Sequence, residues 1–353
     1  SAGDNDHPTR SQRVPVLALH LRSGWQRVIP FHDTTRHEPS SLSPGLSVVV
    51  PVYRGGRTIE ELRRQIATAM ADLAVDWELV FVDDASPDGS WKIIEAMSTE
   101  DARVRGIQMS RNYGQHAALL AGIRAARFDV TITMDDDLQH RPDQIAVLLA
   151  ALDDDTDLVY GQPEIEEHAP WRNVTSRLAK WVLATTIGAE QARETSAFRA
   201  FRTALREGWR RVSDPFVSID VLLSWTTTHH CAVTVVMDER SVGTSNYTFR
   251  KLVLHMINML TGYSTRPLRA VTWLGFLASA FGFAVLLYVI IQYLVSDSSV
   301  PGFAFIASLV ALLGGMQLFG LGMIGEYLGR VHVRSMDRPT YMVRRTTTET
   351  PRT

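Results

Sequence analysis

Cysteine is nearly absent from this sequence: Cys231 is the only one in 353 residues. A single thiol excludes an intramolecular disulfide framework and a cysteine-rich zinc site. A strong net charge is absent as well, because 36 Lys and Arg nearly balance 38 Asp and Glu and leave a formal net charge of −2. The composition therefore gives no reason to expect a nucleic-acid partner.

The N-terminus lacks the features of a secretory signal. Asp4 and Arg10 lie near its start, and Arg22 and Arg27 interrupt its only apolar stretch. Residues 1–44 are polar, and we treat them as an N-terminal extension without an assigned function. We therefore expect the domain that follows to remain in the cytoplasm.

Charged residues are also absent from two long stretches near the C-terminus, 270–296 and 298–325, which Asp297 separates. Each stretch exceeds the roughly 20 residues that a helix needs to cross the hydrocarbon core of a membrane. One such run would also suit a buried helix of a soluble protein. Two in tandem predict a two-helix transmembrane hairpin over 270–327.

Basic residues indicate the orientation of this hairpin. They precede the first stretch and follow the second, and the connecting loop has none. Because cytoplasmic flanks are enriched in Lys and Arg, we expect the loop to face outward and both chain ends to stay in the cytoplasm, including a tail over 328–353. The chain is thus predicted to be a multi-pass protein that contacts the lipid bilayer.

The segment 241–269 mixes apolar and basic residues just before the first stretch. Phe249, Leu252 and Met256 recur near helical spacing, and Lys251 lies among them. This pattern predicts an amphipathic helix in the cytoplasmic interface of the membrane. A helix that packs against the soluble domain is the alternative.

Residues 45–240 alternate strand-like and helix-like stretches. The segments LSVVVPVY, WELVFVDD, RGIQMS and DVTITM read as buried strands, with helix-like stretches around 58–73, 90–97 and 114–126 between them. This alternation predicts a Rossmann-like α/β domain with a mostly parallel sheet covered on both faces. The segment RPTYMVRR, near the C-terminus, is a candidate for one further strand.

Polar side chains follow three of these strands, at Tyr53, at Asp83 and Asp84, and at residues 135–137. Ligands of such sheets bind beyond the carboxyl ends of the strands, so the active site is expected there. Asp83 or Asp84 would accept a hydrogen bond from a nucleobase N–H or a ribose hydroxyl. The alternative for this pair is to cap the next helix.

The acidic run Met134–Gln139 is the candidate metal site. Alternation along a strand would place Asp135 and Asp137 on one side, and Gln139 adds a neutral oxygen. Oxygen ligands suit Mg²⁺ or Mn²⁺, which usually bridge phosphates as well. A solvated acidic turn is the alternative.

The segments VVVPVY, VDDASPDGS, SRNYGQHAALLAG and MDDDLQ, in this order, resemble family 2 glycosyltransferases of the GT-A fold. The later segments ERSVGTSNYTF, STRPLR and GMIGEYLGRV resemble the bacterial polyprenyl-phosphate glycosyltransferases, which carry a two-helix C-terminal anchor. The resemblance covers about residues 46–343. It implies an inverting transfer of a sugar from a nucleotide sugar, with a UDP-sugar as the expected donor, to a polyprenyl phosphate at the inner membrane. It also implies a homo-oligomer, for which we expect a tetramer.

The resemblance assigns roles to individual residues. On the donor side it implies a nucleoside pocket at Pro51, Tyr53 and Asp84, and a divalent ion at Asp135, Asp137 and Gln139. On the acceptor side it implies phosphate contacts in the stretches SAFRAFR and ERSVGTS, at Arg199, Arg202, Arg240 and Ser245. Asp135, Asp137 and Arg199 form the implied catalytic set.

Two positions depart from the family pattern. Relatives often have Asn-Glu after PVY, where this chain has Arg54-Gly55, so a usual carboxylate contact to the nucleoside is missing. Glucose-transferring relatives often have an acidic residue where this chain has Ala197, which argues against glucose. Two alternatives to the implied activity stay open: a catalytically silent scaffold that binds sugar lipids, and a glucose-specific transferase.

The predicted anchor also gives an expectation for a shortened chain. A chain ending before Thr248 is expected to lose the membrane anchor and keep donor binding.

Overall fold

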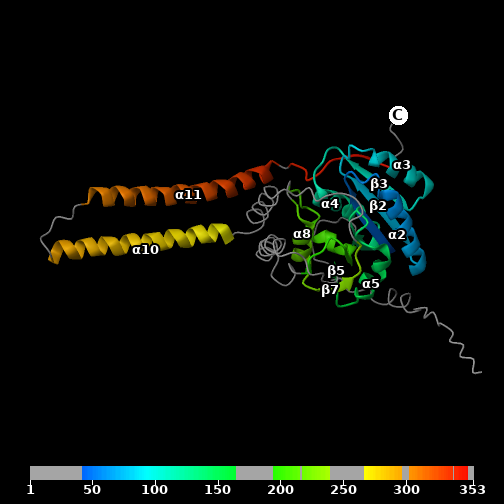
Figure 1. The fold of residues 1–353 in the computed structure, drawn as a ribbon, viewed down its shortest axis with the longest axis horizontal. Helices are drawn as coiled ribbons and strands as arrows, with labels where there is room; N and C mark the ends of the chain where they lie inside the picture. Colours follow the sequence, from blue (N-terminus) through cyan, green and yellow to red (C-terminus); the bar gives the residue numbers. More distant parts are fainter. Residues whose placement is uncertain are drawn as a thin grey trace, which may run out of the picture.

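The computed structural model describes residues 42–163, 194–214, 217–238, 266–295, 302–336 and 338–348. A sheet domain lies at one end of the molecule, and two long helices extend from it (Figure 1). The expected N-terminal extension and the amphipathic segment fall outside the described residues, except for residues 42–44 and 266–269.

The first half of the domain contains the predicted βαβ units. Four parallel strands alternate with three helices, in the order β1 (Ser43–Val52), α2 (Ile59–Leu73), β2 (Trp77–Asp83), α3 (Ser90–Glu100), β3 (Val104–Met109), α4 (Gln115–Ala125) and β4 (Phe128–Thr133). The strands and helices expected here are confirmed. β1 begins at Ser43, so the sheet includes the last residues of the expected N-terminal extension.

The second half widens the sheet on both sides. It comprises η1 (Pro142–Gln144), α5 (Ile145–Ala150), β5 (Leu158–Pro163), β6 (Arg199–Arg202), η2 (Thr203–Trp209), α8 (Ile219–Thr226), β7 (His230–Val235) and, after the long helices, β8 (Val343–Thr346). The strand order is β7-β5-β6-β4-β1-β2-β3-β8. Only β6 and β8 run antiparallel to their neighbours, so the sheet is mostly parallel as predicted. The segment RPTYMVRR supplies β8, which confirms it as a strand.

Alternation along β1 divides the core between the two faces of the sheet. Val48 and Val50 pack in one apolar cluster with Ile59 and Leu62 of α2, and Val49 packs in the other with helix α4. All three valines are fully buried. A strand buried on both faces has to be apolar at every position, and this explains the continuous VVV run.

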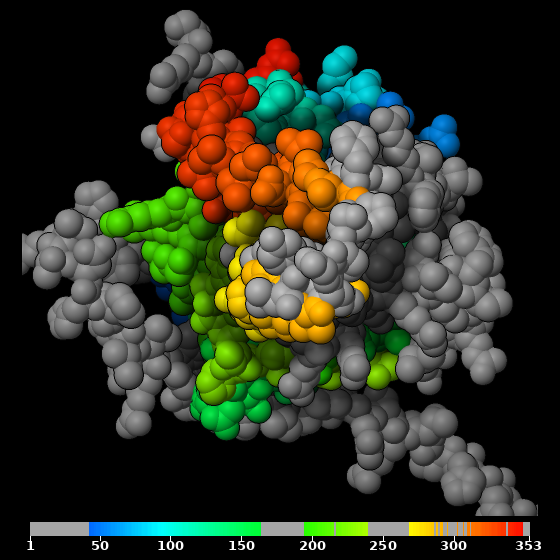
Figure 2. All heavy atoms as spheres, turned by 90° about the vertical axis from the view of Figure 1, so that its left-hand side faces the viewer, coloured from blue at the N-terminus to red at the C-terminus, as the bar shows by residue number. Residues whose placement is uncertain are grey.

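Two long helices occupy the predicted transmembrane stretches. α10 spans Arg266–Val295 and α11 spans Phe303–Ser335, and they lie side by side in Figure 1 and in front of the sheet domain in Figure 2. Many of their apolar side chains are exposed, Trp273 and Leu318 among them. Within the described residues one helical stretch, Leu268–Val285, has the length and composition to cross a membrane, and none of it is buried.

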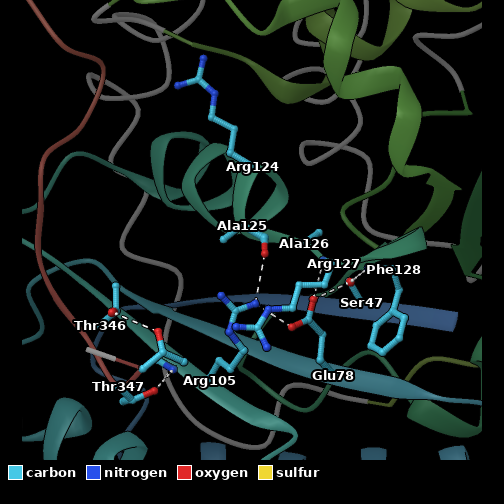
Figure 3. Close-up of polar contacts among 12 residues, drawn as sticks. Ser47, Glu78, Arg105, Arg124, Ala125, Ala126, Arg127, Phe128, Thr346 and Thr347 are labelled. Carbon is cyan, nitrogen blue, oxygen red and sulfur yellow. Dashed lines mark hydrogen bonds and ion pairs between the residues drawn. The ribbon is translucent and has the colours of Figure 1, made fainter. Parts of the chain in front are cut away.

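A buried ion pair at the amino ends of the parallel strands ties three strands and a loop together (Figure 3). One Glu78 carboxylate oxygen accepts from Ser47 Oγ at 2.8 Å and from the Arg127 backbone N–H at 2.7 Å. The other accepts from the Arg105 guanidinium at 2.7 Å, and this guanidinium also donates to the Ala125 carbonyl at 3.1 Å. Glu78 is almost fully buried, so these donors compensate its charge.

Replacing Glu78 with Ala should destabilise the fold strongly, because it leaves a buried guanidinium and a backbone N–H without their acceptor. We expect a loss of about 3–5 kcal/mol in the free energy of unfolding. Urea unfolding of the full chain, followed by tryptophan fluorescence, measures this loss. Glu61→Ala breaks an exposed ion pair with Arg64 and serves as the control, with little expected change in the midpoint. Equal midpoints for the two variants would contradict the structural role of Glu78.

Candidate active site

The candidate site lies where β4, β1, β2 and β3 end at one edge of the sheet. β1 has β2 on one side and β4 on the other, so the direction of winding reverses at β1, where crevices open in such sheets. The Asp84 N–H donates to the Val52 carbonyl at 2.9 Å, and the Met134 N–H donates to the Val49 carbonyl at 3.3 Å. These bonds place the polar residues after the three strands at adjoining positions, as the sequence predicted.

Residues 135–137 form a turn rather than the end of a strand. β4 ends at Thr133, and Leu138 adopts a left-handed conformation with φ of 63°. The expectation that Asp135 and Asp137 lie on one side because they alternate along a strand is therefore wrong, since the strand ends at Thr133. Asp137 Oδ1 instead accepts from the Gln139 backbone N–H at 3.2 Å, and Asp135 Oδ1 accepts from Gln115 Nε2 at 2.7 Å.

The turn offers a small set of oxygen donors for a divalent ion. The ranges that the structure describes contain no group of three or more His, Cys, Asp and Glu that could hold a metal. Mg²⁺ is commonly held by one or two carboxylates and completed by waters and substrate phosphates. Asp135 and Asp137, with the amide oxygen of Gln139, have the chemical type of donor that such a set requires.

Asp136 lies between the chain segments that follow β1 and β4. The Tyr53 backbone N–H donates to its carboxylate, and its buried Oδ2 has no hydrogen-bond partner among the described residues. Burial, with the neighbouring charge of Asp135, raises the pKa of this carboxyl to about 7. A Cβ at Gly55 would overlap Oδ2. The departure at position 55 therefore has a steric reason, because Asp136 fills the space that a side chain there would enter.

In the structure Asp83 and Asp84 support the loops that follow β2 and β3. Asp83 is fully buried and its carboxylate accepts from the Ser86 backbone N–H at 3.1 Å. Asp84 accepts from the backbone N–H groups of Tyr113 and Gly114 at 2.7 and 2.8 Å. Burial raises the pKa of Asp84. Both carboxylates thus hold the loops after β2 and β3, and the predicted direct contact of either one with a nucleoside stays untested.

Tyr53 supplies an open aromatic surface at the end of β1. Its side chain is 47% exposed, and the Arg54 guanidinium lies 5.5 Å from its ring centroid. Pro51, two residues earlier, is buried within β1. Of the predicted nucleoside residues, Tyr53 is therefore the one with a face that a planar base could contact.

Arg199 is buried behind the acidic turn. Its Nε donates to Thr133 Oγ1 at 3.0 Å, and its guanidinium pairs with Asp220 of α8. Burial is the largest influence and would lower the pKa of Arg199, but Asp220, with Tyr160 and Asp135, outweighs it and the pKa is raised. The guanidinium therefore holds α8 against β4, and the structure does not present it on an open surface for an acceptor phosphate.

Arg202 lies at the far end of the sheet from the site. β6 runs antiparallel to β4, so Arg199 pairs with Thr133 at the site edge, and Arg202 pairs with Val130 near the start of β4. Three residues along a strand span roughly 10 Å. This position, and the hydrogen bond that the Arg202 guanidinium donates to the Asp153 carbonyl at 2.6 Å, argue against the predicted phosphate contact at Arg202. Two other predicted contacts, Arg240 and Ser245, lie outside the described residues.

Three residues of the site were missed by sequence reasoning. His140 Nδ1 accepts from the Asp135 backbone N–H at 3.1 Å, and its ring stacks on Phe198 with centroids 5.2 Å apart. Burial lowers the pKa of His140, which favours this neutral acceptor form. Gln115 and Asp220 are the other two. His140 directly follows the acidic run and could have been included, whereas Asp220 gives no local signal.

Comparison with known proteins is consistent with this architecture. Residues 47–209 match the family described as "Glycosyl transferase family 2". The undecaprenyl-phosphate 4-deoxy-4-formamido-L-arabinose transferase of Pseudomonas aeruginosa (strain LESB58) is 32% identical over 310 residues, which cover 87% of this chain and 91% of that protein. The transferase of the same name from Shewanella sediminis (strain HAW-EB3) is 33% identical over 301 residues, covering 84% and 91%.

Among solved structures, a complex of Mycobacterium tuberculosis glucosyl-3-phosphoglycerate synthase with Mn²⁺, uridine-diphosphate and glucosyl-3-phosphoglycerate is similar to this chain. The TM-score is 0.47 and the sequence identity 19%, over 64% of this chain and 84% of that chain.

Gly55→Ala should weaken nucleotide binding, because the added methyl group displaces the Asp136 carboxylate from the crevice beside Tyr53. We expect the dissociation constant for UDP, measured by calorimetry with Mn²⁺ present, to rise several-fold. Gly89→Ala is a control for a glycine at a loop, since a Cβ there meets nothing within 4 Å, although its φ of 84° adds backbone strain. Unchanged UDP affinity in Gly55→Ala would show that the position of Asp136 does not matter to the pocket.

Proposed function

Because this chain belongs to glycosyl transferase family 2 and is similar over most of its length to polyprenyl-phosphate transferases, we propose that it transfers a sugar from a nucleotide sugar to a polyprenyl phosphate. The expected donor is a UDP-sugar and the expected acceptor undecaprenyl phosphate, used at the cytoplasmic face of a bacterial inner membrane.

The extent of the likeness to the transferases carries this proposal. A match that covers 87% of this chain cannot be confined to the sheet domain and has to include α10. A lipid-borne acceptor needs an enzyme that works at the membrane surface, and α10 is long and apolar enough to cross one. The acidic turn at the switch point supports a donor site on the same molecule.

The proposed reaction makes modest demands on the protein's own acids and bases. The second pKa of a phosphate monoester is about 6, so the acceptor oxygen is largely anionic at neutral pH. This oxygen attacks the anomeric carbon, the bond from that carbon to the diphosphate oxygen breaks, and the nucleoside diphosphate leaves with the electron pair. Direct attack inverts the anomeric centre. No carboxylate base is required, so Ala197 is compatible with the chemistry.

Residues of the acidic turn would stabilise the leaving group. Asp135, Asp137 and Gln139 would hold Mg²⁺ or Mn²⁺, which neutralises the negative charge that develops on the diphosphate. Gln115 and the His140 ring orient the side chain and backbone of Asp135. Arg240 and Ser245 remain the proposed contacts to the acceptor phosphate. The guanidinium of Arg199 acts from behind the turn, where it fixes Thr133 and Asp220.

We further propose that α10 and α11 form a transmembrane hairpin and that the chain assembles as a homo-oligomer, a tetramer being the expected size. The exposed apolar side chains of both helices support a lipid-facing position. A silent sugar-lipid scaffold and a glucose-specific transferase are the alternatives to the proposed activity.

A panel of nucleotide sugars tested with undecaprenyl phosphate distinguishes these possibilities. The panel contains UDP-4-deoxy-4-formamido-L-arabinose, UDP-glucose and other UDP- and GDP-sugars. We expect one donor other than UDP-glucose to give a lipid-extractable product in which the sugar is linked through a single phosphate. Selective use of UDP-glucose would favour the glucose-specific reading. Nucleotide binding without product from any donor would favour the scaffold.

Removal of the divalent ion should abolish transfer, with activity restored by Mn²⁺ or Mg²⁺ after chelation by EDTA. Asp137→Asn should lower kcat by on the order of 10²-fold or more, if the ion contributes several kcal/mol to departure of the leaving group. Asp143 lies six residues after Asp137, and its exposed carboxylate pairs with Arg141. Asp143→Asn should therefore retain near-normal turnover. Full activity in EDTA, or equal turnover of the two variants, would argue against metal-assisted departure.

A further inference from the structure

The chain returns to the catalytic domain after α11. Residues Val343–Thr346 form β8, which pairs antiparallel with β3 at the edge of the sheet. The backbone also joins on either side, because the Ser110 N–H donates to the Met342 carbonyl at 2.8 Å and the Thr347 N–H donates to the Gly106 carbonyl at 3.0 Å. The Thr347 side chain adds a bond, since its Oγ1 accepts from the Gly106 N–H at 2.9 Å. Figure 3 shows Thr346 and Thr347 near Arg105 of β3. The last described residues are thus part of the sheet that carries the site.

Arg345 of β8 contacts both β3 and α3 through its side chain. Its Nε donates to Gln108 Oε1 at 2.8 Å, and its guanidinium lies 3.3 Å from the Glu95 carboxylate. The guanidinium also lies over the Trp91 ring, 4.9 Å from the centroid. These contacts with α3 and β3 fix the position of the guanidinium although the side chain is exposed.

The Gln108 side chain connects Arg345 to Asp83, at the end of β2. Its Nε2 donates to Asp83 Oδ2 at 3.0 Å, and both side chains are buried. An arginine can only donate and an ionised carboxylate can only accept, so the amide of Gln108 has one orientation that satisfies both neighbours. The Gln108 amide therefore depends on Arg345 on one side and holds Asp83 on the other.

Asp83 in turn positions the loops that frame the nucleoside pocket. Its other oxygen accepts from the Ser86 backbone N–H at 3.1 Å, and Ser86 Oγ accepts from the Arg54 backbone N–H at 3.2 Å. Arg54 directly follows Tyr53, whose ring is open at the site. A continuous series of hydrogen bonds thus runs from the C-terminal strand to the backbone beside the pocket.

We propose that Gln108 and Arg345 are positioning residues of the nucleotide pocket, so that donor binding depends on the strand that follows the membrane helices. The proposal rests on the proposed function for the identity of the ligand. It predicts the opposite of the expectation that a chain ending before Thr248 keeps donor binding. That expectation took the pocket to consist of earlier strand ends alone, and such a chain lacks β8.

Gln108→Glu in the full-length protein distinguishes the hydrogen bond to Arg345 from the hydrogen bond to Asp83. A glutamate keeps an acceptor for Arg345, so β8 stays paired with β3. It also places a second carboxylate against Asp83, which repels it and loosens the turn at Ser86. We expect the dissociation constant for UDP, with Mn²⁺ present, to rise by about tenfold or more, and the KM for undecaprenyl phosphate to stay within about twofold.

Hydrogen exchange reads the positioning directly, without any ligand. In Gln108→Glu the backbone amides of Ser86 and Arg54 should exchange faster, and the amides of β3 that pair with β8 should stay protected. Arg345→Ala, an exposed substitution that the fold should tolerate, is expected to speed exchange at the same two amides and to weaken UDP binding several-fold. Arg344→Ala is the matched control. Arg344 is exposed, precedes Arg345 in β8, and by strand alternation faces away from Gln108.

Unchanged exchange at Ser86 and Arg54 in both Gln108→Glu and Arg345→Ala would overturn the proposal, as would wild-type UDP affinity in both. Equal losses in Arg344→Ala would overturn it too, since the effect would then come from the strand as a whole. If the wild-type chain binds no UDP, the proposed donor is wrong, and the exchange rates alone decide whether β8 positions the loops.

Discussion

Five carboxyl groups crowd one edge of the sheet, and the site depends on how each negative charge is compensated. Asp83 and Asp84 accept hydrogen bonds from backbone N–H groups of the loops that follow β2 and β3. Asp136 is compensated least, and the rise of its pKa to about 7 reflects burial beside Asp135. Asp135 and Asp137 are half-buried on either side of Asp136, and a cation would relieve the repulsion among these carboxylates. The edge is therefore suited to a ligand that brings positive charge with it, such as a metal-bound diphosphate.

The fold of the first half could be predicted because its sequence pattern is local. The run Val48–Val50 is apolar at every position, and it forms a strand buried on both faces. Turn and helix signals between such runs located the strand ends, and with them the acidic turn. The apolar pattern was therefore sufficient to predict where the acidic turn lies in the fold.

The roles of individual side chains were harder to predict than the fold, because they depend on contacts between elements that are distant in the sequence. Arg199 and Arg202 look equivalent in SAFRAFR, but they stand at opposite ends of β6, whose antiparallel pairing with β4 places only Arg199 beside the acidic turn. Arg199 is then neutralised by Asp220, which no spacing connects to it. The contact between Gln108 and Arg345 joins residues 237 positions apart. Neither residue stands in a motif, so only the fold could reveal the pair.

The return of β8 to the sheet also constrains how the two helices can lie in a membrane. The strands that precede α10 and the strand that follows α11 belong to one sheet, so the start of α10 and the end of α11 have to lie on the same side of any membrane. An ion pair between Arg334, near the end of α11, and Asp214 agrees with this arrangement. A single crossing would place β8 on the opposite side from β3. If α10 crosses the membrane, as its length and composition allow, α11 therefore has to cross back. The pairing of β3 with β8 thus supports the proposed hairpin through backbone geometry, independently of the distribution of basic residues from which the orientation was predicted.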